Sequence, residues 1–137
     1  MQISLANTSQ AGLIETFFSD NLLGDNDAIY SAELTCPLGI HAAVRRKQMI
    51  VATVEGEIIA ACRFYPKKTQ SKISLYQFAV RSDYRGKGLL KKMFAVLPDD
   101  PIISICPIHS NFNNYYSKTG WTLHNQNGEF KIWTILK

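Results

Sequence analysis

The chain has 137 residues, of which 46% are apolar, and its formal net charge is +4. This length and composition predict one folded domain spanning residues 1–137 and exclude a disordered chain. The apolar runs are too short to cross a bilayer, so no membrane partner is expected. The first residues lack a basic segment ahead of an apolar run, and the three cysteines form no C-x-x-C pair, so we expect a cytoplasmic protein without a signal peptide, disulfide or metal site.

The N-terminal third predicts a strand followed by helices. Residues 2–6 suit a short strand, and Asn7 or Thr8 can cap a helix whose apolar residues recur at helical spacing. A weaker helix is expected over residues 27–34, ending before a proline. Residues 38–47 have no clear pattern.

The middle of the chain predicts three antiparallel strands and then a helix. Residues 48–54 and 57–65 form a hairpin around the Glu55-Gly56 turn, and residues 72–80 add a third strand. The helix is expected to begin at Gly86, because leucine, methionine and phenylalanine recur on one face from there.

The C-terminal part predicts a strand at 102–106, a helix at 111–118, and a closing hairpin of residues 121–126 and 129–136 around Asn127-Gly128. Together these elements predict an α+β domain. Its mixed, mostly antiparallel sheet would have about seven strands and about four helices.

Positive charge is concentrated where the third strand of the middle region meets its helix. Between Arg81 and Lys92 lie five basic residues and one acidic residue, an excess of four that equals the excess of the whole chain. Gly86 and Gly88 let the backbone approach a ligand, and a helix start offers unpaired N–H groups, which favours a phosphate ligand. The P-loop pattern G-x-x-x-x-G-K-[ST] is absent. The dinucleotide-binding pattern G-x-G-x-x-G is incomplete, because Lys91 stands at the position of its third glycine.

The run from Val80 to Leu90 (VRSDYRGKGLL) resembles the acyl-CoA signature of the GNAT superfamily of N-acetyltransferases, (Arg/Gln)-x-x-Gly-x-(Gly/Ala). Arg85 and Gly88 match its first two fixed positions. Leu90 departs from the third, and a leucine there is expected to weaken phosphate binding without abolishing it.

A second segment, Tyr116 to Trp121 (YSKTGW), resembles the family's Tyr-x-Lys-x-Gly-Phe segment. The asparagine that commonly stands seven positions before that tyrosine is replaced here by His109. Asn111 and Asn113 are close alternatives, and Asn111 is taken as the cofactor-binding candidate.

The resemblance implies that acetyl-CoA is the co-substrate and that its pantetheine arm pairs with the edge of a splayed strand. The implied cofactor-binding residues are Phe78, Ala79, Val80, Arg85, Gly86, Lys87, Gly88, Leu89, Leu90 and Asn111. No metal is expected.

The resemblance also implies a direct attack of an amine on the thioester, with Tyr116 protonating the departing thiolate. The amine must lose a proton, because its pKa is about 10.4. Gln77 cannot act as a base, and the residues leave Glu33, His41, Asp27 or water as alternatives.

The predicted function is N-acetyltransfer from acetyl-CoA to a small-molecule or peptide primary amine. A non-catalytic acyl-CoA sensor is the alternative, since Gln77 and Leu90 permit it. Nucleic-acid binding through the Arg81–Lys92 segment is disfavoured because that segment is short and only Tyr84 interrupts it with an aromatic ring. The sequence leaves the acyl chain length open, and the closing hairpin could pair across a homodimer.

Overall fold

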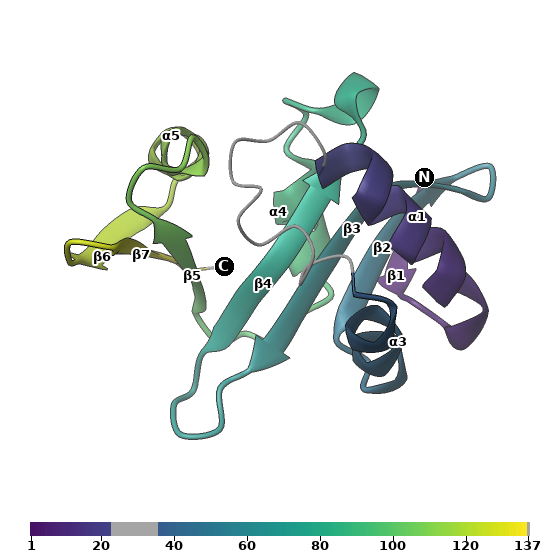
Figure 1. Cartoon of the computed structure of the whole chain (residues 1–137), viewed down its shortest axis with the longest axis horizontal. Coiled ribbons are helices and arrows are strands. Elements are labelled where there is room, and N and C mark those ends of the chain that lie inside the picture. The colour runs from purple at the N-terminus through teal and green to yellow at the C-terminus, as the bar shows by residue number, and fades with distance from the viewer. Residues whose placement is uncertain (23–35, 137) are drawn as a thin grey trace.

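The computed structural model describes residues 1–22 and 36–136, and in them the chain forms one seven-stranded sheet (Figure 1). The strands are β1 (Gln2–Leu5), β2 (Met49–Val54), β3 (Glu57–Pro66), β4 (Ile73–Val80), β5 (Ile102–Pro107), β6 (Thr122–Gln126) and β7 (Phe130–Ile135). The helices are the α-helices α1 (Ala11–Leu22), α3 (Pro37–Arg45), α4 (Leu89–Phe94) and α5 (Phe112–Lys118), with short 3-10 helices η1 (Thr8–Gln10) and η3 (Ser82–Tyr84). The described residues thus confirm the predicted α+β class.

The sheet has the order β1-β2-β3-β4-β5-β7-β6, and it divides between β4 and β5. These two strands run parallel and pair only at Ile73–Ile102 and Ser74–Ile103. Beyond this point β5 leans away from β4, and we call the place where their C-terminal ends diverge the opening (Figure 1). The remaining neighbours in the sheet pair antiparallel.

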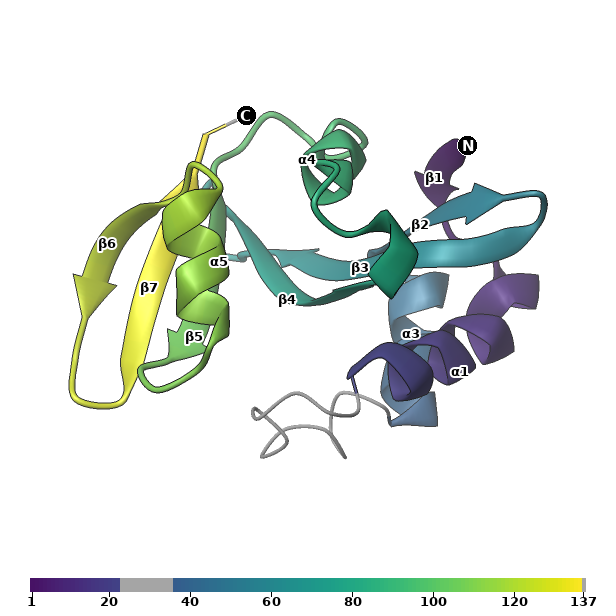
Figure 2. The ribbon, with the colours of Figure 1, turned by 90° about the horizontal axis from the view of Figure 1, so that it is seen from above.

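Helices cover both faces of the sheet. Helices α1 and α3 pack on one face, where Ile14, Phe18 and Ile40 are completely buried. Helix α4 packs on the other face (Figure 2). Its Met93 is completely buried in a core cluster that includes residues of β2 and β3. Burial of these apolar side chains is the main force that holds the layers together.

Strands β5, β6 and β7 together with α5 form a unit that we call the C-terminal arm. The segment that connects β5 to α5 is held by Asn113. The carboxamide nitrogen of this residue donates to the carbonyls of Pro107, Ile108 and Ser110 at 2.9, 3.2 and 3.0 Å. The carboxamide oxygen accepts from the indole nitrogen of Trp133 at 2.9 Å. These buried and partly buried hydrogen bonds tie the start of α5 to β7 and make the arm a defined wall of the opening.

Two helices differ from the sequence-based expectation. Residues 38–47 had no predicted state, and they lie mostly in α3, which has a proline in its first turn. The helix expected from Gly86 begins at Leu89, because Gly86 and Gly88 have φ angles of +77° and +70°, outside the right-handed helical region. The helix expected over residues 27–34 lies outside the described residues.

No helix in the described part of the chain is both long enough and apolar enough to cross a membrane.

Candidate active site

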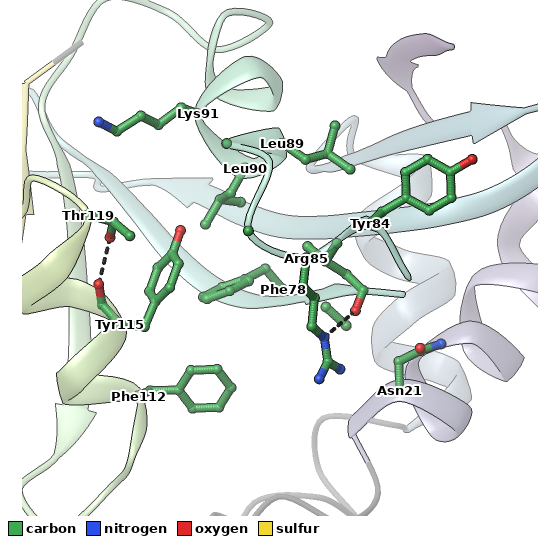
Figure 3. Close-up of a pocket in the computed structure, with 14 residues that line it drawn as sticks. Asn21, Phe78, Tyr84, Arg85, Leu89, Leu90, Lys91, Phe112, Tyr115 and Thr119 are labelled. Carbon is green, nitrogen blue, oxygen red and sulfur yellow. Dashed lines mark hydrogen bonds between the residues drawn. The ribbon is translucent and has the colours of Figure 1, made fainter. Parts of the chain in front are cut away.

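A cavity of about 440 Å³ lies where β4 and β5 diverge (Figure 3). Its walls come from the end of β4, the following loop, the first turn of α4, one side of α5 and the last turn of α1. The lining residues are Asn21, Phe78, Ala79, Val80, Tyr84, Arg85, Gly86, Gly88, Leu89, Leu90, Lys91, Phe112, Tyr115 and Thr119. Most of the predicted cofactor-binding residues therefore gather in one place.

Residues 85–88, which we call the glycine loop, form an open backbone surface on this cavity. Gly86 and Gly88 both have positive φ, and a Cβ atom added to either would meet nothing within 4 Å. The space above the loop therefore admits a bulky group against bare backbone, which is what a phosphate ligand requires. Helix α4 has only six residues, so the loop itself supplies most of this surface.

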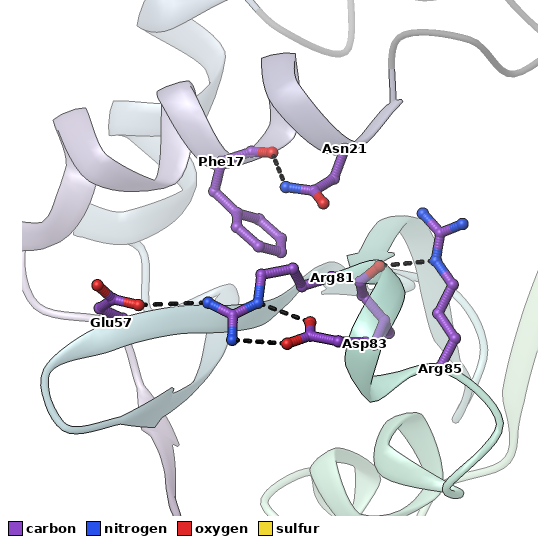
Figure 4. Close-up of polar contacts among 7 residues, drawn as sticks. Phe17, Asn21, Glu57, Arg81, Asp83 and Arg85 are labelled. Carbon is purple, nitrogen blue, oxygen red and sulfur yellow. Dashed lines mark hydrogen bonds and ion pairs between the residues drawn. The ribbon is translucent and has the colours of Figure 1, made fainter.

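Arg81 ties η3, which precedes the glycine loop, to β3, and it is not among the residues that line the cavity. Its guanidinium contacts both carboxylate oxygens of Asp83, at 2.7 and 3.0 Å, and one oxygen of Glu57 on β3, at 3.3 Å (Figure 4). Arg81 holds the pKa of the Asp83 carboxyl below its usual value, chiefly through this hydrogen bond. The charge of Arg81 is thus balanced by neighbours, and the basic segment acts on the cavity mainly through other residues.

Arg85 holds the start of the glycine loop against the end of β4. Its Nε donates to the carbonyl of Val80 at 2.8 Å, and its side chain lines the cavity (Figures 3 and 4). The contact fixes the turn that carries the chain from the strand end to Gly86. It also places a guanidinium at the end of β4 in the cavity wall, where it adds positive charge for an anionic ligand.

Tyr116 lies behind the cavity wall. Its side chain is 4% exposed and is not among the lining residues, and its hydroxyl forms a 2.7 Å hydrogen bond with Ser104 of β5. Its ring lies 5.8 Å from Trp133 and 5.0 Å from Trp121. Burial raises the pKa of this hydroxyl well above its ordinary value. The predicted acid role of Tyr116 stays a prediction, and the structure places the residue inside the C-terminal arm.

Tyr115 lies in the cavity wall instead. Its ring is half-buried and stands 5.5 Å from the ring of Phe78, across the opening from β4 (Figure 3). Partial burial is the main cause that raises the pKa of its hydroxyl. The sequence motif selects the tyrosine four residues before Gly120, whereas the cavity selects Phe112, Tyr115 and Thr119. Those three share the i, i+3, i+7 face of one helix, a signal that could have identified Tyr115.

Comparison with known proteins identifies the family. Residues 14–97, more than half of the chain, match the model of the acetyltransferase (GNAT) family. The chain belongs to the GNAT acetyltransferase family. This confirms the resemblance that the glycine-loop motif predicted. A search of curated proteins found no significant match.

Solved structures agree with the GNAT fold. The PaiA N-acetyltransferase of Thermoplasma acidophilum, in complex with coenzyme A, matches with a TM-score of 0.73, 13% identity, and coverage of 99% of this chain and 98% of that one. GNAT-family acetyltransferases of Streptococcus agalactiae and Listeria monocytogenes match with TM-scores of 0.76 and 0.75 and identities of 12% and 13%. Coverage is 99% of this chain in both, and 95% and 94% of the respective relatives. At such low sequence identity, the structural similarity shows only that this chain has the same fold as those proteins.

Two predicted cofactor-binding residues of this GNAT domain lie outside the cavity lining. Lys87 has its ammonium group 5.2 Å from the ring centre of Tyr84, and Asn111 is exposed at the start of α5. Conversely, Lys91 lines the cavity although the motif gave it no role. Leu90 also lines it, but its side chain is 4% exposed and packs in the core, so it leaves the glycine loop open.

The base candidates are not brought together by the described residues. His41 is half-buried on α3 and is not among the lining residues of the described cavity. Asp27 and Glu33 lie outside the described part of the chain. The choice between these residues and water therefore stays open.

Proposed function

We propose that this protein transfers an acetyl group from acetyl-CoA to a primary amine of a small molecule or peptide by direct attack. The observation that carries the proposal is the glycine loop, whose backbone opens onto a cavity at the divergence of β4 and β5. Membership of the acetyltransferase family supports the reaction class. Acetyl-CoA supplies the activated acyl group as a thioester.

The residues of the cavity suit the parts of such a co-substrate. The backbone of the glycine loop would hold the phosphates, and Arg85 and Lys91 would add positive charge to the cavity wall. Residues 78–80 would offer their strand edge to the amide-bearing arm, since the strand pairs with β5 only at its beginning. Phe78 and Phe112, with ring centres 5.6 Å apart, would exclude water from the acyl group.

The protein must also manage two proton movements. The attacking amine has an ordinary pKa of about 10.4, so a base or a water chain has to remove its proton. The leaving thiol has an ordinary pKa of about 8.5, so its thiolate needs only a modest proton donor. A hydroxyl in the cavity wall could meet the second need, and the lining residues that carry one are Tyr84, Tyr115 and Thr119.

A thermal melt of the protein with and without saturating acetyl-CoA tests the cofactor part, with ATP as control. A ligand at one hundred times its Kd stabilises the folded state by about 2.7 kcal/mol, which for this size raises the melting temperature by several degrees. Absence of a shift would contradict acyl-CoA binding. Thiol release measured over a panel of amines then tests transfer, and a shift without turnover on any amine would favour an acyl-CoA sensor.

A further inference from the structure

Two adjacent tyrosines of α5 have different surroundings, and the difference bears on the proposed transfer reaction. Successive helical residues point about 100° apart, so Tyr115 and Tyr116 cannot both face the same surface. Tyr115 faces the cavity and Tyr116 faces the β5–β7 side of the arm. The residue that fits the family motif is therefore the one turned away from the cavity.

The hydroxyl of Tyr116 is held by the fold. It is bonded to Ser104 within a buried cluster, and its ring is enclosed by the two tryptophans of the arm. Bringing this hydroxyl into the cavity would break a buried hydrogen bond and open the packing between α5 and β7. Leaving a buried hydroxyl unpaired costs about 1–3 kcal/mol, before any loss of packing is counted.

Among the described residues that line the cavity, three carry a hydroxyl group. Tyr84 belongs to the loop side, where Arg81 and Lys87 each lie 5.2 Å from its ring centre. Thr119 donates its hydroxyl to the carbonyl of Tyr115 at 2.7 Å. Tyr115 is the one beside Phe78, within the part of β4 that no longer pairs with β5, and in Figure 3 its hydroxyl lies on the Leu90 side of the cavity.

We propose that Tyr115, and not Tyr116, is the hydroxyl that faces the thioester sulfur and protonates it as the carbon–sulfur bond breaks. This assignment rests on the proposed function. The amine nitrogen forms the new bond to the acyl carbon, and the electron pair of the broken bond leaves on sulfur. Tyr115 gives its proton to that sulfur, and its oxygen recovers the proton that the nitrogen loses. Tyr116 is a positioning residue that fixes α5 on β5.

The local environment of Tyr115 agrees with this role. Burial beside Phe78 raises its pKa, so the hydroxyl stays protonated at neutral pH and is available as a donor. Such a phenol is a weaker acid than the thiol it protonates. Just after the new bond forms, the acylated nitrogen still carries an extra proton, and in that state it is a far stronger acid than the phenol or the thiol. Loss of that proton to the Tyr115 oxygen completes the transfer.

The assignment can be tested without turnover, by measuring the affinity of CoA as a function of pH. A donor hydroxyl at the sulfur stabilises the thiolate and lowers the pKa of the bound thiol, so CoA should bind more tightly as pH rises toward the free thiol's pKa of about 8.5, and the gain should level off above it. Each unit of lowering gives up to about a tenfold gain in affinity at high pH. A CoA analogue with hydrogen in place of the thiol gives the pH dependence of affinity that comes from phosphate and lysine titrations alone. Subtracting it leaves the contribution of the thiol.

Tyr115→Phe should abolish the thiol-dependent gain in affinity, whereas Tyr116→Phe should keep it and lower the melting temperature. Tyr115→Phe should also reduce kcat with little change in acetyl-CoA affinity at neutral pH. If the gain disappears in Tyr116→Phe and persists in Tyr115→Phe, the assignment is reversed. If wild type itself shows no gain while CoA binds and acetyl transfer proceeds, no hydroxyl faces the sulfur, and only this inference fails. If wild type does not bind CoA, the proposed function fails with it.

Discussion

The hydrogen bond between Tyr116 and Ser104 is a residue-scale feature with a measurable contribution to stability. Tyr116→Phe leaves the buried Ser104 hydroxyl without this partner, so we expect the free energy of unfolding to fall by about 1–3 kcal/mol. A double variant that also carries Ser104→Ala no longer has the unpaired hydroxyl, so it should recover part of the lost unfolding free energy. Urea denaturation of the two single variants and the double variant measures this. Purely additive losses would show that the two hydroxyls do not interact.

Lys91 and Lys92 provide a matched pair at the same scale. Both are exposed on α4, but only Lys91 is among the residues that line the cavity. Lys91→Gln should weaken CoA binding by up to about fivefold, with a smaller loss at high salt, because exposed charge pairs contribute about 0.2–1 kcal/mol. Lys92→Gln should leave the affinity unchanged. If titration calorimetry shows an equal loss of CoA affinity in both variants, the two lysines act only through the long-range electrostatic field of the protein.

Residues whose chemistry depends on local backbone were predictable from the sequence, and those that depend on helix orientation were not. The two glycines and Arg85 were expected to lie together because a phosphate loop needs bare backbone and charge within a few positions, and all three line the cavity. Tyr115 was missed because motif spacing indicates a position in the chain, whereas the packing of α5 on β5 and β7 decides which side of the helix faces the cavity.

The glycine loop is best tested at the scale of an element, with another turn as control. Gly88 and Gly56 both have positive φ, at +70° and +81°, and both have open space where a Cβ would lie. Glutamate at either position should therefore cost a similar backbone strain of about 1–2 kcal/mol. Gly88→Glu should also abolish CoA binding, because it places a carboxylate in the phosphate space. Gly56→Glu should bind normally in a melt with CoA, and a loss of binding in both variants would point to a general folding defect.

The strands were predicted to within about two residues because alternation and turn residues agree. In the β2–β3 hairpin, Glu55 and Gly56 both have positive φ, as the tight turn requires. The helices were harder. Pro37 was interpreted only as an end signal, whereas it also occupies the first turn of α3. The start of α4 was placed too early because the positive φ of Gly86 and Gly88 cannot be seen in a hydrophobic pattern.

At the scale of the whole molecule, the sheet is weakest where its two parts meet. The join of β4 and β5 has two register pairs, whereas β5 and β7 pair at six positions. Acetyl-CoA that inserts at this join should slow amide hydrogen exchange at residues 78–80 more than at β2, which already has a strand on each side. Mass-spectrometric exchange with ATP as control measures this. Uniform slowing across the sheet would contradict insertion at the join.

The placement of the two tryptophans gives this protein an internal optical reporter. Both Trp121 and Trp133 surround Tyr116, so all tryptophan emission originates in and around the C-terminal arm, and none comes from the α1–α3 face. Trp121 also stands 6.0 Å from Phe94 of α4, so its ring joins the arm to that helix within the core. Its emission therefore reports on the packing of the arm against α4. A change in that packing on ligand binding can be measured by fluorescence in the unlabelled protein.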